Sequence, residues 1–223
     1  MRRDSLHILI FLVSLSAGVT SCGLNQGIRS EKPNIVILFC DDLGYGDLSS
    51  FGHPTIKTPN LDQMVTEGMK FTNFYSASPK CTASRYSLLT GRLPIRSGFG
   101  AVLSPGSKKG IHSKEITLAE GLKEGGYTTA IFGKWHLGHL KEYLPLQHGF
   151  DEYLGFPYSN DMGSKNRPIP LLQGNDTLEL NPNQGKLTKL YTDQAINFIQ
   201  RNNFFFTCLM PCRMCHCIQA KLL

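Results

Sequence analysis

The chain has 223 residues, a net charge of +6 and 41% hydrophobic residues. This length and composition are typical of a globular protein with one domain and a sizeable core. The positive charge is scattered, and no basic run is interleaved with aromatic residues, so nucleic acid is not an expected partner. A modest basic balance is compatible with anionic substrates.

The first 21 residues have the pattern of a secretory signal peptide, with a basic start, an apolar core at residues 8–13 and small residues up to Ser21. The apolar run is too short to span a bilayer. Val-Thr-Ser-Cys22 resembles a bacterial lipobox, whose cysteine is lipidated; the alternative is an ordinary signal peptide with an incidental Cys22. We therefore expect an exported lipoprotein of a bacterium, periplasmic or at the outer surface. A lipid anchor would hold it to the membrane, and residues 22–32 would serve as a linker.

A continuous apolar run at residues 34–40 predicts a strand that is buried on both faces. Asp41 and Asp42 follow directly, at the end of a strand where ligand sites of open α/β sheets lie. Adjacent carboxylates repel each other unless a cation joins them, and oxygen ligands suit Ca²⁺ or Mg²⁺. The alternative is a solvated acidic turn.

Cys81 stands at the start of a predicted helix, because residues 84–90 have helical apolar spacing and Gly91 is a stop signal. A helix N-terminus attracts anions, and Arg85 lies one turn further on the same face as Cys81. The segment thus combines a nucleophile, an anion site and a cation. The alternative is a buried structural cysteine.

The remaining pattern predicts helices at 60–67, 117–124 and 187–201, and strands at 70–75 and 127–132 with another starting at 203–207. Residues 164–186 are polar and rich in Pro, Gly and Asn, and predict a loop. Lys134 and His136 follow the 127–132 strand, where the alternative is a surface loop. The alternation of elements predicts an α/β layer with helices on both faces of the sheet.

Four motifs carry a resemblance: PNIVILFCDDLGYGD at 33–47, CTASRYSLLTGRLPIRSG at 81–98, GKWHLG at 133–138 and GFDEYLGFPYSND at 149–161. In order and spacing they resemble the type I sulfatases, in the branch of arylsulfatase A and N-acetylgalactosamine-6-sulfatase. The resemblance implies an α/β, alkaline-phosphatase-like fold with a mixed, mainly parallel sheet flanked by helices. Residues 33–206 would be the N-terminal part of a sulfatase catalytic domain.

The resemblance also implies a sulfuric ester hydrolase, acting on sulfated small molecules or glycans, and a role for each site residue. Cys81 would be oxidised by a maturase to formylglycine, whose hydrate attacks the sulfur of a sulfate ester. The metal, Ca²⁺ or Mg²⁺, would be held by Asp41, Asp42 and the modified Cys81. The remaining roles are these: Arg85 holds the hydrated aldehyde, Lys134 contacts sulfate and leaving oxygen, His136 contacts the modified side chain or its sulfate, and Ser159 contacts sulfate.

One position departs from the pattern, since many family members have proline where this chain has Ala83. The aerobic oxidase that makes formylglycine depends strongly on that proline, whereas radical-based maturases of anaerobic bacteria accept alanine. The resemblance therefore favours an anaerobic or facultative bacterial source. If no maturase accepts this context, Cys81 stays a thiol.

The cysteine-rich end of the chain permits two interpretations. Cys212 and Cys215 with His216 have a zinc-type spacing, but no second ligand pair follows. Read in the neighbouring frame, permissible codons for residues 206–221 can give Tyr-Leu-Pro-Tyr-Ala-Met-Pro-His-Val-Pro-Leu-Tyr-Pro-Ser-Glu, which resembles the family's next motif. We favour a one-nucleotide frameshift near Phe206, which makes residues 207–223 an out-of-frame tail.

A frameshift would remove the family's later catalytic histidine, an Asp-Asn pair of the metal site and a second lysine. We therefore expect the 223-residue product to be unstable and catalytically silent, although it is a sulfatase by descent. Two alternatives stay open. One is a formylglycine-dependent phosphodiesterase or phosphonate hydrolase of the same fold, and the other is a non-catalytic metal-binding lipoprotein.

Overall fold

The computed structural model describes residues 32–202 and 205–210 of the chain. The predicted signal peptide, the lipidation site Cys22, nearly all of the linker, and residues 211–223 of the predicted tail lie outside the described residues. Those expectations stay predictions. In the described part, no helix combines the length and apolar character needed to cross a bilayer.

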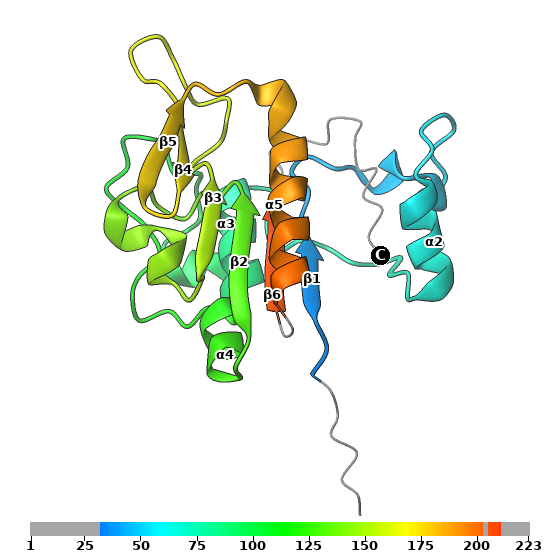
Figure 1. The fold of residues 1–223 in the computed structure, drawn as a ribbon. Helices are drawn as coiled ribbons and strands as arrows, with labels where there is room; N and C mark the ends of the chain where they lie inside the picture. Colours follow the sequence, from blue (N-terminus) through cyan, green and yellow to red (C-terminus); the bar gives the residue numbers. More distant parts are fainter. Residues whose placement is uncertain (1–31, 203–204, 211–223) are drawn as a thin grey trace, which may run out of the picture. The chain divides into compact units, whose positions relative to one another are not determined.

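A six-stranded mixed sheet organises the fold (Figure 1). Its strands run in the order β1, β6, β2, β3, β4, β5. The first four are parallel, and β4 pairs antiparallel with both β3 and β5. This confirms the predicted mixed, mainly parallel sheet. The strands are β1 (Ile35–Leu38), β2 (Thr128–Gly133), β3 (Glu152–Gly155), β4 (Pro170–Gln173), β5 (Asp176–Leu180) and β6 (Phe205–Met210).

Helices cover both faces of this sheet, as the sequence predicts. Alternate residues of β2 divide between two cores: Ile131 packs with the buried residues of α3 and α4, whereas Ala130 and Phe132 pack with those of α5. In Figure 1, α5 lies in front of β6 and β2. The α-helices are α2 (Pro59–Glu67), α3 (Cys81–Thr90), α4 (Leu118–Glu124) and α5 (Leu187–Arg201).

Local signals account for the ends of the helices. Thr117 begins α4 with a capping box, in which its side chain accepts from the Glu120 N–H and the Glu120 carboxylate accepts from the Thr117 N–H. Gly91 ends α3 in the left-handed conformation (φ 65°) that glycine adopts without strain. Short 3₁₀ turns join the elements: η1 (Tyr45–Asp47), η2 (Ser49–Phe51), η3 (Pro94–Ser97), η4 (Lys141–Tyr143), η5 (Pro145–Gln147) and η6 (Gln184–Lys186).

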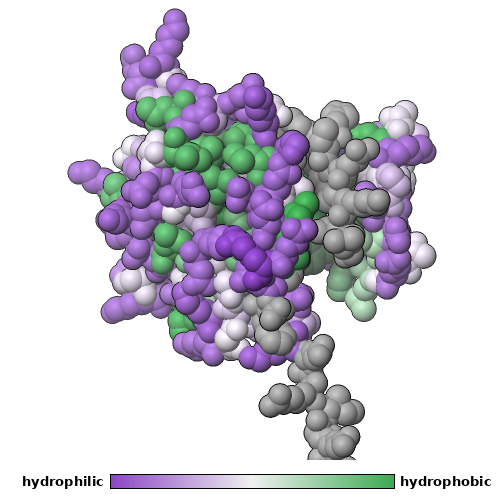
Figure 2. Space-filling view, in the orientation of Figure 1, coloured by the Kyte–Doolittle hydropathy of each residue, from purple (hydrophilic) through white to green (hydrophobic). Residues whose placement is uncertain are grey.

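Hydrophilic side chains cover most of the face that α5 presents, and apolar ones gather between α5 and the β4–β5 hairpin (Figure 2). The predicted helix 187–201 has the bounds found for α5. It buries four side chains against the sheet, namely Leu187, Tyr191, Ala195 and Phe198.

The expectation that the first strand is buried on both faces is wrong. β1 lies at the edge of the sheet, and among the described residues only β6 pairs with it. Val36, whose side chain points to one face of the sheet, is 37% exposed, so that face is not fully covered. An apolar run predicts a strand that can be buried, but it does not show whether another part of the protein covers it.

The predicted strand at 70–75 is also wrong, since these residues are neither strand nor helix and all of them are exposed. A strand needs a hydrogen-bonding neighbour, and the described residues provide none here.

The predicted loop at 164–186 is wrong in its middle part, which contains the β4–β5 hairpin. Gln173 pairs with Asp176 across a two-residue turn in which Gly174 has a φ of 62°. This Gly174-Asn175 turn between two apolar stretches is a recognised hairpin signal.

Residues 207–210, the first of the predicted out-of-frame tail, belong to β6 and pair with both β1 and β2. The strand therefore continues through the position where we place the frameshift. The reading frame of residues 207–223 stays a prediction.

Candidate active site

Two buried cations converge on one carboxylate at the carboxyl ends of β1 and β2. Arg85 Nη2 lies 2.8 Å from Asp41 Oδ1, and Lys134 Nζ donates to Asp41 Oδ2. The side chain of Arg85 is completely buried, that of Lys134 is 3% exposed and that of Asp41 is 11% exposed. Burial alone would raise the pKa of Asp41, but the charges and hydrogen bonds of Arg85 and Lys134 outweigh it and lower that pKa below its usual value.

Backbone and side-chain contacts fix both cations in place. Arg85 Nη1 donates to the Lys134 carbonyl at 2.5 Å, so the helix α3 and the end of β2 are joined directly. The guanidinium lies over the ring of Phe39, 5.5 Å from its centroid. Lys134 Nζ also donates to the buried hydroxyl of Ser159 at 3.2 Å. The structure thus brings together four residues of the sequence prediction, namely Asp41, Arg85, Lys134 and Ser159.

His136 lies just after β2 and is 1% exposed. Its backbone has a positive φ of 62°, which is uncommon for a residue other than glycine. Nε2 lies 2.9 Å from the Leu103 carbonyl, whereas the buried Nδ1 has no hydrogen-bond partner among the described residues. Burial lowers the pKa of His136 to about 4, and the positive charges of Lys134 and Arg85 act in the same direction.

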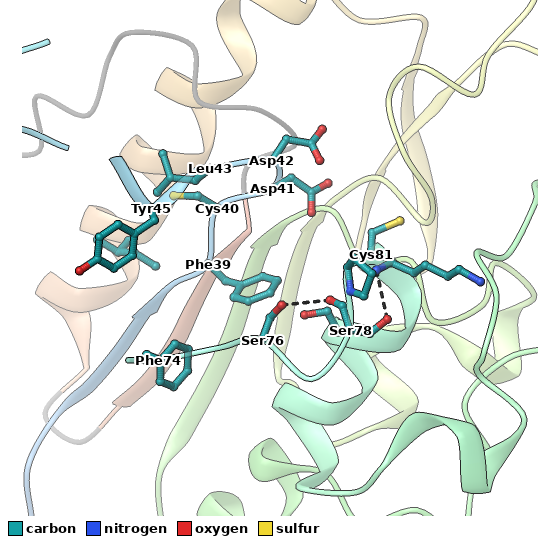
Figure 3. A pocket seen from close by; sticks show the side chains of 14 residues that line it. Phe39, Cys40, Asp41, Asp42, Leu43, Tyr45, Phe74, Ser76, Ser78 and Cys81 are labelled. Carbon is teal, nitrogen blue, oxygen red and sulfur yellow. Dashed lines mark hydrogen bonds between the residues drawn. The ribbon is translucent and has the colours of Figure 1, made fainter. Parts of the chain in front are cut away.

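Cys81 is the first residue of α3 and has a free, partly exposed thiol. It lines a cavity of about 470 Å³ together with Asp41 and Asp42. Figure 3 shows the two aspartates projecting from the segment after β1, and Cys81 at the start of the helix across from them. Asp42 has a φ of 53°, a left-handed conformation that aspartate tolerates better than most residues. The three predicted metal ligands therefore share one cavity.

The described residues fit only part of a metal site. Among them, no group of three or more His, Cys, Asp and Glu side chains is placed to hold an ion together. Both oxygens of Asp41 already accept from Arg85 and Lys134. Because Ca²⁺ takes six to eight oxygen ligands, Asp41 and Asp42 alone do not satisfy it, and we assign no reaction step to a metal in this part of the chain.

Several residues at the site escaped the sequence analysis. The loop at Leu103 is held on both sides, since its N–H donates to the Thr82 hydroxyl and its carbonyl contacts His136. Cys40 also lines the cavity, and burial, reinforced by the charge of Asp41, raises the pKa of its thiol. These contacts join segments that are distant in sequence, so a local sequence pattern does not predict them.

A match to a family model assigns the chain to a protein family. Residues 33–212 match the model of the sulfatase family. The chain belongs to the sulfatase family. It is 55% identical over 137 residues to arylsulfatase A of Bos taurus (60% of this chain and 27% of the relative) and 41% identical over 203 residues to N-acetylgalactosamine-6-sulfatase of Canis lupus familiaris (82% and 39%).

Solved sulfatase structures agree with the fold. The structure of Ps i-CgsB in complex with k-i-k-neocarrahexaose superposes with a TM-score of 0.71 at 29% identity, covering 82% of this chain and 46% of that one. This confirms the alkaline-phosphatase-like sulfatase fold, of which the described sheet is a part. Sulfatases generally use formylglycine and a divalent metal. The chain spans 27% and 39% of the length of these two curated relatives, so the activity of the whole protein is a matter for proposal.

Proposed function

We propose that this chain provides the nucleophile and the sulfate-binding half of a sulfuric ester hydrolase site. The observation that carries the proposal is the pair of buried cations that meet at Asp41, namely Arg85 in the helix that begins at Cys81 and Lys134 after β2. A buried anion site of this kind suits a sulfate group, because the cations are fixed before the ligand arrives.

The nucleophile in this proposal is Cys81 after oxidation to formylglycine by a maturase. The aldehyde hydrates, and one hydroxyl attacks the sulfur of the ester while the alcohol leaves. The second hydroxyl then loses its proton and sulfate is expelled, which restores the aldehyde. The partly exposed thiol at the mouth of the cavity is accessible for this chemistry.

Four residues act around that nucleophile. Arg85 holds the hydrated aldehyde, and Lys134 contacts sulfate and the leaving oxygen. Ser159, which already accepts a hydrogen bond from Lys134, contacts the sulfate. His136 contacts the modified side chain or its sulfate, and its lowered pKa of about 4 keeps the ring neutral at pH 7, with its buried Nδ1 available as a partner.

Asp41 and Asp42 supply part of the coordination of a divalent ion, Ca²⁺ or Mg²⁺, in the completed site. A bound ion would lower the energy of the attacking alkoxide and hold sulfate oxygens. The remaining ligands come from polypeptide beyond the described residues, because two carboxylates do not complete the shell. The 223-residue chain by itself is therefore expected to be silent.

Sulfated glycans are the proposed substrate class. Support comes from the solved relative in complex with k-i-k-neocarrahexaose, and from the curated relative named N-acetylgalactosamine-6-sulfatase. Export as a lipoprotein anchored through Cys22 would bring the enzyme to such polymers outside the cell.

The proposal is tested in two stages. Mass spectrometry of the Cys81 peptide, from a host that has an anaerobic-type maturase, should show conversion to formylglycine. A full-length form with the reading frame restored near Phe206 should then release sulfate from 4-nitrophenyl sulfate, and Cys81→Ala should abolish release. Faster turnover of 4-nitrophenyl phosphate, or turnover that survives Cys81→Ala, would refute sulfate-ester hydrolysis through Cys81.

A further inference from the structure

The loop that leads to Leu103 is tied to the start of α3 at two points. Leu103 N–H donates to the Thr82 hydroxyl at 3.1 Å, and Lys80 Nζ donates to the Gly100 carbonyl at 2.7 Å. Thr82 is completely buried, and the partly buried side chain of Leu103 packs against the larger hydrophobic core. Lys80 and Thr82 stand on either side of Cys81, so the position of the loop is coupled to the segment that carries the proposed nucleophile.

The carbonyl of Leu103 determines which ring nitrogen of His136 carries the proton. A carbonyl oxygen only accepts hydrogen bonds, so its contact of 2.9 Å with Nε2 requires the proton to be on Nε2. With the proton on Nδ1 instead, lone pairs of Nε2 and of the carbonyl oxygen would face each other. Burial and the charges of Lys134 and Arg85 keep the ring neutral at pH 7, and a neutral ring has one N–H. Nδ1 is therefore an acceptor, and no described residue uses it.

The backbone of His136 is held separately from its ring. Trp135 N–H donates to the Phe156 carbonyl at 2.9 Å, and His136 N–H donates to the Pro157 carbonyl at 3.2 Å. These bonds support the positive φ of 62° at His136, a conformation that persists where the surroundings hold it. They do not fix the rotation of the side chain, whose ring has its one hydrogen bond within the described residues at Leu103. The orientation of the ring consequently depends on the loop that Thr82 holds.

We propose that Thr82 is a positioning residue for His136: by holding Leu103 it keeps the proton of the ring on Nε2 and leaves Nδ1 as a hydrogen-bond acceptor in the active site. Thr82 acts through a single residue, since the N–H of Leu103 bonds to Thr82 and the carbonyl of Leu103 bonds to His136. Lys80 contributes less, because its bond to the loop is exposed and competes with water.

The value of this arrangement for catalysis rests on the proposed function. The hydrate of formylglycine at position 81 has two hydroxyl groups, and a hydroxyl can donate to an acceptor such as Nδ1 of His136. A ring with its proton on Nδ1 would offer a second donor in place of that acceptor. The position of the proton itself does not depend on the modification of Cys81, so it can be measured in a chain that has no activity.

Nuclear magnetic resonance of the full, isotope-labelled chain at neutral pH tests the proposal, with His136→Gln used to assign the signals of the ring. In the parent chain the proton should be on Nε2 and should exchange slowly with water, because it is buried and hydrogen-bonded. Thr82→Val, which lacks the hydroxyl, should make this proton exchange at least about tenfold faster. Thr82→Ser, which keeps a hydroxyl, should return the exchange to the parent rate.

Thr90→Val is the matched control for this measurement. The Thr90 hydroxyl accepts from the Arg92 N–H at the other end of the same helix, so its loss should leave the His136 proton unchanged. The backbone amides of β2 report on global unfolding and should exchange equally in Thr82→Val and in the parent. A proton on Nδ1 in the parent, or no slowly exchanging ring proton there, would overturn the proposal. Equal acceleration of the ring proton and the β2 amides in Thr82→Val would assign Thr82 to stability alone, with the same consequence.

Kinetics of the matured, frame-restored form on 4-nitrophenyl sulfate give a second readout. Thr82→Val should lower kcat at least about tenfold and leave KM within about twofold, while Thr82→Ser and Thr90→Val should behave like the parent. Because Thr82 adjoins Cys81, the rates are divided by the formylglycine content that mass spectrometry measures. An active parent with an unchanged kcat in Thr82→Val would overturn the positioning role. An inactive parent would count against the proposed function alone, since the exchange of the His136 proton then decides the role of Thr82.

Discussion

Arg85 and Asp41 are 44 positions apart in sequence and meet at 2.8 Å, with the guanidinium fully buried. Removing the guanidinium by Arg85→Met should cost about 3–5 kcal/mol of unfolding free energy, since Asp41 and the Lys134 carbonyl lose a partner in a buried environment. Urea unfolding followed by the fluorescence of Trp135, the single tryptophan, measures this. Arg92→Met is the control, because the Arg92–Glu115 pair has a 58% exposed arginine and should contribute at most about 1 kcal/mol.

His136 should make the fold sensitive to acid. Its pKa is about 4 in the folded chain against 6.5 for the ordinary side chain, so between these values the unfolded state binds a proton that the folded state does not. Stability should therefore fall as the pH drops from about 6.5 to about 4, by an amount on the order of 3 kcal/mol, and His136 should contribute no further loss below that. Urea unfolding at several pH values measures how the unfolding free energy changes with pH.

His136→Gln should remove the part of the pH dependence of the unfolding free energy that His136 contributes, while keeping a donor for the Leu103 carbonyl. His148 is also buried with a lowered pKa, so part of the acid sensitivity should persist in the variant. If the unfolding free energy of His136→Gln depends on pH as in the parent chain, His136 does not titrate differently in the folded and unfolded states.

Gly155 should tolerate no side chain. A Cβ at this position would lie 1.7 Å from the Gly133 carbonyl oxygen, at the carboxyl ends of β2 and β3. Gly155→Ala should destabilise the fold by at least about 3 kcal/mol, because a backbone atom is in the way and the strands must shift. Gly121→Ala in α4 is the matched control, since nothing lies within 4 Å of its Cβ, and it should stabilise by about 0.5–1 kcal/mol.

Ala83→Pro should increase formylglycine formation in an aerobic host. Ala83 lies in the first turn of α3, and the first helical bond along the chain is made by the Ser84 N–H. Proline at position 83 therefore removes no helical hydrogen bond and should cost little stability. Mass spectrometry of the Cys81 peptide from parent and variant, produced with an aerobic maturase, compares the conversion. Equal conversion in both would mean that Ala83 does not limit maturation of this chain.

The sequence predicted well what depends on neighbouring residues. The helix α5 follows from local periodicity, the predicted helix at 117–124 agrees with α4 to within one residue, and the strand ends carry Asp41, Lys134 and His136 as expected. Four motif residues do meet in space, and Arg85 contacts Asp41 and the Lys134 carbonyl, two partners that its position one turn after Cys81 does not predict.

Two of the errors concern neighbouring strands that a local pattern cannot reveal, and the third concerns a local turn signal that was missed. Val36 has the apolar character of a buried strand residue, but it lies on an edge. Phe71 and Phe74 have strand-like composition, but no strand lies beside them in the described part of the chain. The hairpin around Gly174 had a usable turn signal, which the overall polarity of residues 164–186 concealed.

The place of β6 between β1 and β2 sets the order of events during synthesis. Ile35 pairs with Phe206, so the earliest strand of the described chain has its hydrogen-bonding neighbour only when the last one has been translated. Closing so long a loop is entropically costly and slows folding. Until then β1 depends on other protection, and a cell that makes this protein is expected to need chaperone binding to the nascent chain during that interval.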